Sequence, residues 1–421
     1  MPGPVESADV IVVGAGPAGS AAAVHLAGAG LDVLLLEKAV FPREKVCGDG
    51  LTPRAVRELA GLGLDTRPEA GWRHNLGLRI WAGRPYPYLM PWPVLADFPA
   101  YGLVRRRADF DALLADRAVQ AGARLVQPVT VTAPVLNRAG RVVGVQTKAG
   151  TQYHAPVTLA CDGNSARLAI AAGRDRRLDR PLGVAVRAYY ASPRADDLWL
   201  ESWLELWDGP PGRSHLLPGY GWSFPLGDGC CNVGLGLTDS STGFGRVDYR
   251  DLLRRWLDTT PPEWGFREAN RQGRIGSAAL PMGFNRRPLY RDGLLLAGDA
   301  AGLVNPFNGE GVSYALESGR YAAEQIVQAR SRGLGCGAAE RALQAYPVRL
   351  GRAWGGYFRL GAVFGHIIGH PRVMRLATRY GLPVPAVRQL VHRLLANLSD
   401  QSPRDVYDVV VNTLSRLTPS A

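Results

Sequence analysis

Three glycines near the N-terminus have the spacing of a dinucleotide-binding turn. Gly14, Gly16 and Gly19 form GxGxxG directly after the apolar run VIVV. In such a turn the first glycine permits a tight bend, the second lets the backbone approach a pyrophosphate, and the third lets a helix pack on a strand. Glu37 ends the next apolar run, where a carboxylate can accept hydrogen bonds from an adenosine ribose and would repel a 2′-phosphate. The spacing therefore predicts a dinucleotide without that phosphate.

A second motif, LLLAGDAAG, distinguishes a flavin dinucleotide from a nicotinamide dinucleotide. Asp299 follows a buried run and is placed to bind the ribityl chain of FAD. The stretch NPFNGEGVSYALESG then predicts a helix that begins at about Gly309 to Val312. Free N–H groups and the positive end of the helix dipole at that position suit the pyrimidine edge of a flavin. We therefore expect FAD as the bound cofactor.

One cysteine stands between a basic run and two glycines, in FPREKVCGDGLTPRAV. Arg43 and Lys45 in this loop could favour the thiolate of Cys47, which makes Cys47 a candidate catalytic residue. Water is an equally reasonable proton source. A small side chain that merely fits beside glycines is a third interpretation, so the role of the thiol stays open.

An aromatic stripe in PGYGWSFPLG is typical of one face of a strand. Tyr220, Trp222 and Phe224 alternate along the chain, and alternate residues of a strand point to the same side. Such a stripe could form the wall of an apolar pocket, or it could belong to the ordinary core.

The glycine, GD and CDGNSARL motifs together resemble a large family of flavoproteins related to aromatic-ring hydroxylases. The resemblance implies that Asp162 and Gly163 form its central DG motif. It also implies that Arg107, in RRRADFD, reaches the cofactor and that the backbone near Thr130 lies beside the adenine. A surface charge within an arginine triplet is the other interpretation of Arg107. Because this family includes hydroxylases, halogenases, epoxidases and double-bond reductases, membership leaves the reaction open.

The cysteine loop and the aromatic strand together resemble the geranylgeranyl reductase family, including its bacterial menaquinone side-chain reductases, over nearly the whole chain. The resemblance implies that the Cys-Gly-x-Gly loop flanks the isoalloxazine ring and that the Tyr-x-Trp-x-Phe-Pro strand lines a tunnel for a prenyl chain. The predicted cofactor-binding residues are Gly14, Gly16, Ala18, Gly19, Glu37, Lys38, Cys47, Gly48, Gly50, Arg107, Thr130, Asp162, Gly163, Gly298, Asp299, Gly309, Gly311 and Val312. The predicted substrate-binding residues are Tyr220, Trp222, Phe224, Pro225 and Pro306.

This resemblance implies an FAD-dependent reductase that saturates carbon–carbon double bonds of an isoprenoid chain by hydride transfer from reduced flavin. NAD(P)H or another reductant would visit transiently, because the chain has no second glycine fingerprint. The alternatives are a monooxygenase or hydroxylase, or a tailoring reductase of a secondary metabolite. A tryptophan-type halogenase is disfavoured, because its Trp-x-Trp-x-Ile-Pro stretch is replaced here by one with Tyr220 and Phe224.

The elements that must position these residues alternate between strand and helix. VIVV and VLLL predict buried parallel strands at Val10–Val13 and Val33–Leu36, joined by a helix in a βαβ unit. The proline-rich stretch WAGRPYPYLMPWP predicts irregular chain or edge strands. We predict an α/β fold of Rossmann type with an inserted β-rich substrate domain and C-terminal helices. The expected divisions are 1–80, 101–180 and 276–330 for FAD, 81–100 and 181–275 for substrate, and 331–421 for the helices.

The composition is that of an ordinary globular protein, with 421 residues of which 46% are apolar and 20% charged. No apolar run is long enough to cross a membrane, and the N-terminus lacks the pattern of a signal peptide, so we expect a cytoplasmic protein. Five cysteines at spacings unlike those of metal sites predict reduced thiols and no bound metal.

The net charge of +12 is concentrated toward the C-terminus. From Arg341 to Ser399 the chain has nine arginines and no acidic residue, alongside apolar pieces such as VRQLVHRLLANL. A solvated, arginine-rich helical face explains this pattern, and so does peripheral attachment to anionic lipid at the inner face of the cell membrane. Nucleic acid is not expected as a partner, because no recognition motif accompanies the charge.

Overall fold

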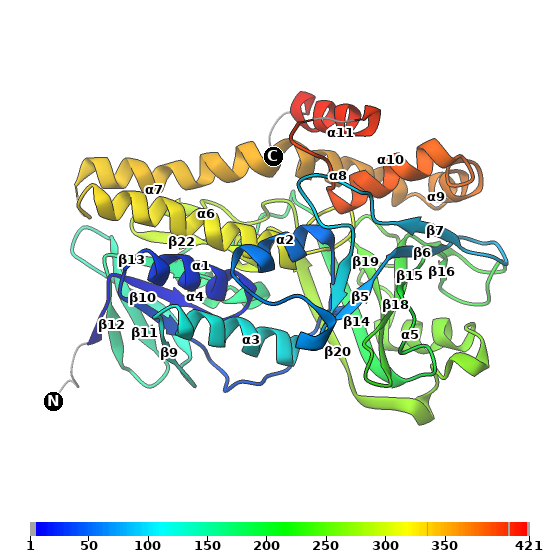
Figure 1. Ribbon diagram of the computed structural model, residues 1–421, viewed down its shortest axis with the longest axis horizontal. Helices are drawn as coiled ribbons and strands as arrows, with labels where there is room; N and C mark the ends of the chain where they lie inside the picture. The colour runs from blue at the N-terminus through cyan, green and yellow to red at the C-terminus, as the bar shows by residue number, and fades with distance from the viewer. Residues whose placement is uncertain (1–5, 335, 403–404, 419–421) are drawn as a thin grey trace.

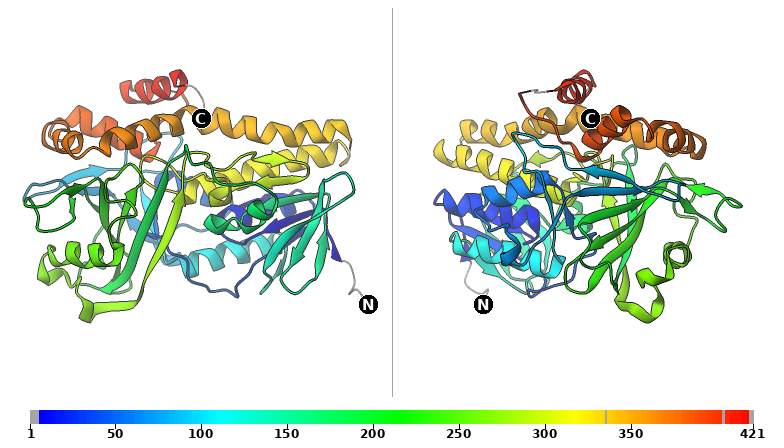
Figure 2. Two further views of the ribbon diagram at one scale, coloured as in Figure 1. Left: turned by 180° about the vertical axis from the view of Figure 1, so that it is seen from behind. Right: turned by 45° about the vertical axis from the view of Figure 1, so that its right-hand side comes forward.

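The computed structural model describes residues 6–334, 336–402 and 405–418. Two large sheets lie toward opposite ends of an elongated molecule, and helices from the last part of the chain run across both (Figure 1). The same layer of helices is seen from behind and from the side (Figure 2).

The first large sheet has six strands in the order β21-β22-β13-β2-β3-β9. Its members are β2 (Val10–Val13), β3 (Val33–Leu36), β9 (Arg124–Val126), β13 (Val157–Ala160), β21 (Tyr290–Arg291) and β22 (Leu294–Leu296). The strands from β22 to β9 are parallel, and β21 is antiparallel to β22. Every residue of β2 and β3 is buried, as expected for parallel strands covered on both faces. The two strands predicted from VIVV and VLLL are thus confirmed as neighbours.

Helices pack closely on this sheet because small residues line their contacts. The main helices here are α1 (Pro17–Gly28), α3 (Arg107–Gln120), α6 (Val312–Ser331) and α7 (Gly337–Leu350). Pro17 occupies the first turn of α1, where its missing N–H leaves no hydrogen bond unmade. A side chain at Gly319 of α6 would bring its Cβ within 2.2 Å of the Ala18 carbonyl oxygen in α1. The predicted start of α6 near Val312 is confirmed.

A smaller sheet, in the order β1-β12-β11-β10, joins this unit through contacts of β11 with β13. Its members are β1 (Glu6–Ser7), β10 (Val131–Leu136), β11 (Val142–Thr147) and β12 (Gln152–His154), and the short helix α4 (Arg167–Ala171) contacts β10.

The second large sheet has seven strands in the order β20-β14-β19-β18-β15-β6-β7. They are β6 (Gly77–Trp81), β7 (Tyr88–Pro91), β14 (Leu182–Ala191), β15 (Trp199–Trp203), β18 (Gly219–Pro225), β19 (Cys230–Thr238) and β20 (Arg271–Pro281). The proline-rich stretch supplies β7 at the edge, as predicted. Helix α5 (Tyr249–Asp258) covers one face, since a Cβ at Gly221 would lie 2.4 Å from the ring of Trp256. Residues that alternate with Gly221 on β18 therefore face the other way.

Short elements complete the fold. They are the three-stranded sheet β4 (Gly50–Leu51), β8 (Gly102–Val104) and β5 (Arg73–Asn75), the helix α2 (Pro53–Gly61), and the pair β16 (Leu206–Trp207) and β17 (Leu216–Leu217).

The C-terminal helices begin in the main core. They are α8 (Gly356–Ile368), α9 (Pro371–Leu376), α10 (Pro385–Ala396) and α11 (Val406–Leu417), with π-helical turns at Gly351–Gly355 and Ala377–Gly381. Trp354 and Phe358 are fully buried, and their rings lie 5.3 and 5.0 Å from that of Tyr314 in α6. Over the described ranges, no helix combines the length and the apolar character needed to cross a membrane.

The predicted fold class, an α/β unit with an added β-rich sheet and C-terminal helices, is confirmed. The predicted domain boundaries stay a prediction. Two of them fall inside strands, because Gly77–Trp81 spans the boundary after residue 80 and Arg271–Pro281 spans the one after residue 275.

Candidate active site

A cavity of about 590 Å³ is lined by residues of both large sheets and of the C-terminal helices. It brings together the predicted site residues except Gly19 and Pro225, which do not line it. At one end Lys38, Glu44 and Arg167 line the cavity and are also exposed. At the other end Val387 of α10 lines it while 41% exposed. We call these the dinucleotide end and the helical end.

The glycine turn at the dinucleotide end has the geometry of a cradle. Gly14 has a φ of +99°, and a Cβ there would lie 2.4 Å from the Cys161 carbonyl oxygen. A Cβ at Gly19 would lie 1.8 Å from the Gly14 carbonyl oxygen, so Gly19 serves the packing of helix on strand without facing the cavity. At Gly16 the nearest atom is Nη2 of Arg43, at 3.8 Å, which leaves room for a ligand against the backbone.

Two arginines and two carboxylates form a buried ion network beside this cradle. Glu37 accepts a hydrogen bond of 2.9 Å from the Ala15 N–H and one of 3.2 Å from Arg43. Asp111 accepts from Arg43 at 2.8 Å and from Arg107 at 2.7 and 2.8 Å. Burial lowers the pKa of the Arg107 guanidinium, but Asp111 outweighs it, so the net shift is upward. Arg107 is therefore a buried, charged wall residue and no surface charge.

The sequence reasoning assigned Arg43 and Lys45 to the cysteine thiol, and the structure engages both cations elsewhere. Arg43 bridges Glu37 and Asp111, and the Lys45 ammonium donates to Oδ1 of Asn164 at 3.1 Å. Burial lowers the pKa of Lys45. Arg43 therefore belongs to the dinucleotide end, where it lies next to Gly16, and it does not pair with the thiol.

Three features at this end fit FAD. Asp162 accepts from the Leu168 N–H at 2.9 Å through Oδ2, while its Oδ1 is buried without a partner among the described residues. Burial raises the pKa of this carboxyl. Helix α6 begins after Gly311 without a side-chain cap, so its first N–H groups are available to a ligand. Asp299 lies beside that helix start, since a Cβ at Gly311 would be 3.2 Å from its Oδ1.

Cys47 lines the cavity on a loop that is anchored from behind by Asp49 and Asn232. Asp49 has a φ of +66° and is 1% exposed. Its carboxylate accepts from the Tyr189 hydroxyl at 2.8 Å, from Asn232 at 2.7 Å and from the Arg107 N–H at 3.2 Å. Asn232 also donates to the Cys47 carbonyl oxygen at 2.7 Å. Burial raises the Asp49 pKa to about 6, although these hydrogen bonds oppose the shift.

The aromatic strand packs directly against this loop. The Trp222 indole donates to Asn232 at 3.0 Å, so one buried amide holds both the aromatic wall and the cysteine loop. Cβ atoms at Gly48 and Gly50 would lie 3.1 and 2.9 Å from the ring of Phe224. The family resemblance places this Cys-Gly-x-Gly loop beside a flavin; the structure shows that the Phe224 ring also leaves little room for a side chain at either glycine.

The C-terminal helices supply cavity-lining residues that sequence reasoning missed, namely Phe364, Ile368, Met374, Thr378, Leu382 and Val391. Their amphipathic pattern was interpreted as an outer surface. An amphipathic pattern shows that one face of a helix is apolar, but it does not show which part of the protein that face covers. The sequence alone therefore could not assign these residues to the cavity. Asp49 and Asn232 were missed as well, although an acidic residue between two glycines was a signal that the loop needed a buried anchor.

Comparison with known proteins agrees with this architecture. Residues 7–208 match the family model of an FAD binding domain. The chain is 38% identical over 400 residues to a menaquinone reductase of Mycobacterium tuberculosis, and the matched region covers 95% of this chain and 93% of the relative. It is 34% identical to digeranylgeranylglycerophospholipid reductase 1 of Methanopyrus kandleri over 76% of this chain and 80% of the relative.

A solved structure shares the fold. It is a geranylgeranyl bacteriochlorophyll reductase-like protein from Thermoplasma acidophilum, with a TM-score of 0.75 and 21% identity over 99% of this chain and 97% of that one.

Proposed function

Because this chain belongs to the FAD-binding geranylgeranyl reductase family and is an FAD-dependent oxidoreductase, we propose that it saturates double bonds in the side chain of a menaquinone or a similar isoprenoid lipid. The proposal draws its substrate class from the relatives, whose names specify a quinone and a geranylgeranyl lipid.

The observation that carries the proposal is the aromatic wall beside the cysteine loop. Tyr220, Trp222 and Phe224 line one side of the cavity, and apolar residues of α8 to α10 extend it toward the helical end. Reduction of an isolated alkene requires an apolar, water-poor channel that holds the chain in one orientation. A wall of aromatic rings on one rigid strand provides that surface.

The cofactor would be held at the dinucleotide end by Gly14, Gly16, Glu37, Arg107, Asp162 and Asp299. When bound and reduced, FAD supplies a hydride, and the alkene needs one proton in addition. The electron donor, NAD(P)H or another reductant, would visit transiently. The residues of the chain orient the alkene, exclude water and provide the proton.

We further propose that the protein docks on an anionic lipid surface through α8 to α10. Ile367, Leu376 and Tyr380 are 47%, 58% and 61% exposed, and they lie on the helices that line the helical end of the cavity. Arg372, Arg375 and Arg379 are exposed on the same helices. Apolar side chains beside arginines match the boundary between lipid tails and anionic head groups.

The reaction is tested with photoreduced enzyme and an unsaturated polyprenyl menaquinone under argon. We expect flavin absorbance to return and the prenyl side chain to gain one H₂, read by mass spectrometry after chemical reoxidation of any quinol to the quinone, because reduction of the ring gives the same mass change. A quinone that is changed only after oxygen is admitted, with incorporation of an oxygen atom, would replace the reductase proposal with that of a monooxygenase.

A further inference from the structure

Five carboxyl groups line the cavity: Glu37, Glu44, Asp162, Asp299 and Glu310. Glu37, Asp162 and Asp299 belong to the dinucleotide end. Glu44 is 63% exposed in its side chain and pairs with Arg187 at 2.9 Å. Glu310 alone of the five stands next to the aromatic wall, in the loop that precedes α6.

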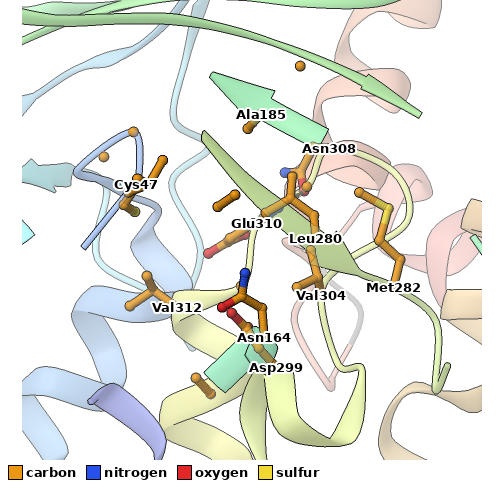
Figure 3. A pocket seen from close by; sticks show the side chains of 18 of the residues that line it. Cys47, Asn164, Ala185, Leu280, Met282, Asp299, Val304, Asn308, Glu310 and Val312 are labelled. Atoms are coloured by element: carbon orange, nitrogen blue, oxygen red, sulfur yellow. Dashed lines mark hydrogen bonds between the residues drawn. The ribbon is translucent and has the colours of Figure 1, made fainter. Parts of the chain in front are cut away.

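Contacts of the neighbouring residues place Glu310 where the two ends of the cavity meet. Tyr220 of the aromatic wall donates to the Asn308 carbonyl oxygen at 2.8 Å, and a Cβ at Gly309 would lie 3.9 Å from the Tyr220 hydroxyl. Burial raises the pKa of Tyr220, and Cys47 and Glu310 are close enough to raise it further. Figure 3 shows Cys47, Glu310, Val312 and Asp299 around one space.

The surroundings of the Glu310 carboxyl favour its neutral form. Oε1 accepts a hydrogen bond of 2.7 Å from the Thr52 hydroxyl. Oε2 is buried and has no hydrogen-bond partner in the described part of the chain, although the Ser313 hydroxyl is close enough to lower the pKa of the carboxyl. An ionised oxygen left in that position would carry a large desolvation cost, whereas a protonated one would not.

The nearest cation does not change this balance. Arg54 forms an ion pair with Glu317 at 2.5 Å and donates to its second oxygen at 2.8 Å, so its charge is compensated there. Burial raises the pKa of Glu310. Hydrogen bonding by Thr52 and Ser313 and the charge of Arg54 lower this pKa, and the charge of Glu317 raises it, so that the net shift is upward. Other titratable groups close by are Cys47, Tyr220, Tyr314 and Tyr357.

We propose that Glu310 is the proton donor for alkene reduction, with its proton on Oε2 and its carboxyl oriented by Thr52. This inference rests on the proposed reductase function. One alkene carbon receives a hydride, and with it two electrons, from reduced FAD. The other carbon receives the Glu310 proton, the π bond is lost, and the resulting carboxylate regains a proton from water before the next turnover.

The first test needs no turnover. Infrared spectra of FAD-loaded wild type and Glu310→Gln are subtracted at neutral pH. We expect the wild type to contribute the C=O band of a neutral carboxylic acid that the variant lacks. A pair of carboxylate bands in its place would overturn the proposal. Retention of FAD by the variant shows that it has folded.

The second test measures the rate of side-chain saturation in an anaerobic single turnover of photoreduced enzyme with an unsaturated menaquinone, because transfer of electrons to the quinone ring would also oxidise the flavin. We expect Glu310→Gln to be slower by about 100-fold or more, with similar quinone affinity. In the wild type the rate should fall as pH rises and Glu310 ionises, and the variant should lack this dependence. The exposed, matched control Glu69→Gln should behave as wild type.

Two further variants separate the alternatives. Cys47→Ser and Tyr220→Phe should keep the alkaline fall in rate even if they are slower. Loss of that fall in Cys47→Ser, with its persistence in Glu310→Gln, would make the thiol the donor and overturn the proposal. If wild type reduces the quinone and Glu310→Gln does so equally fast, only the inference is wrong. If wild type fails to reduce any double bond, the proposed function itself is wrong.

Discussion

At the scale of single residues, the site depends on a buried polar network that holds the cysteine loop. Asn232 accepts from Trp222 and donates to both Asp49 and the Cys47 carbonyl, so all its polar hydrogens and its oxygen are used. Such fully satisfied networks fix one arrangement of their surroundings. Substitution of either Asp49 or Asn232 should therefore displace the loop and the aromatic wall together.

The ionisation of Asp49 should be visible in the stability of the protein. Its pKa is raised by burial from 3.8 to about 6, so between these values the folded protein binds more protons than the unfolded chain. The contribution of Asp49 to the free energy of unfolding therefore falls as pH rises through this window, by on the order of 3 kcal/mol.

Urea denaturation of wild type and Asp49→Asn from about pH 5 to about pH 7 tests this. We expect the free energy of unfolding of the wild type to fall relative to that of Asp49→Asn as pH rises. Asp65→Asn is the control, because Arg67 lowers the pKa of Asp65 to about 2, so this exposed carboxyl is ionised in both the folded and the unfolded protein over this pH range and its difference should not change. A difference that is independent of pH would show that Asp49 does not titrate in this range.

At the scale of elements, the sequence was most informative where a local motif determines the structure. The strand at Val10–Val13, the glycine turn and the start of α6 could be predicted because apolar runs, glycines and helix starts are local signals. The inward side of α8 to α10 could not, because an amphipathic pattern shows that a face is apolar but not what it covers. The role of Asp49 could not be predicted either, because its hydrogen-bond partners lie 58 to 183 residues away in the sequence.

The close contact between α1 and α6 should be sensitive to a single methyl group. At Gly319 an added Cβ would lie 2.2 Å from backbone oxygen, which cannot move without shifting a helix. We expect Gly319→Ala to lower the free energy of unfolding by about 1–3 kcal/mol, despite the better helix propensity of alanine. Bound FAD should decrease as well, because α6 begins at the cavity.

Thermal unfolding and flavin absorbance measure both effects. The matched control is Gly28→Ala on α1, where an added Cβ has no atom within 4 Å. Gly28→Ala should be neutral or slightly stabilising. Equal behaviour of the two variants would show that α1 and α6 can separate without cost.

At the scale of the whole molecule, the C-terminal helices both close the cavity and present the proposed lipid-docking surface. Removing the chain after Arg341 would therefore be a poor test of docking, because it would also remove the buried Trp354 and Phe358. Point substitutions on the outer face leave the core intact.

Docking is tested by sedimentation with vesicles that contain phosphatidylglycerol. We expect the triple variant Ile367→Ser, Leu376→Ser, Tyr380→Ser to bind at least about tenfold more weakly than wild type, and added salt to weaken both. The control is Leu178→Ser, at a site that is 85% exposed outside these helices. Equal loss of binding in the control would show that the attachment is not specific to α8 to α10.

The two ends of the cavity set a limit on how a long substrate can be handled. If the substrate is a prenyl chain, as proposed, and enters near Val387, a cofactor at the dinucleotide end would close the far end of its path. A channel closed at its far end admits a chain only to a fixed depth, so the bond that reaches the reactive position is selected by counting isoprene units from the tip that enters. The product must then back out by the same route. The depth of the cavity would then select the isoprene unit that is saturated, and substitutions that change this depth should alter the position of saturation before they alter the rate of the reaction.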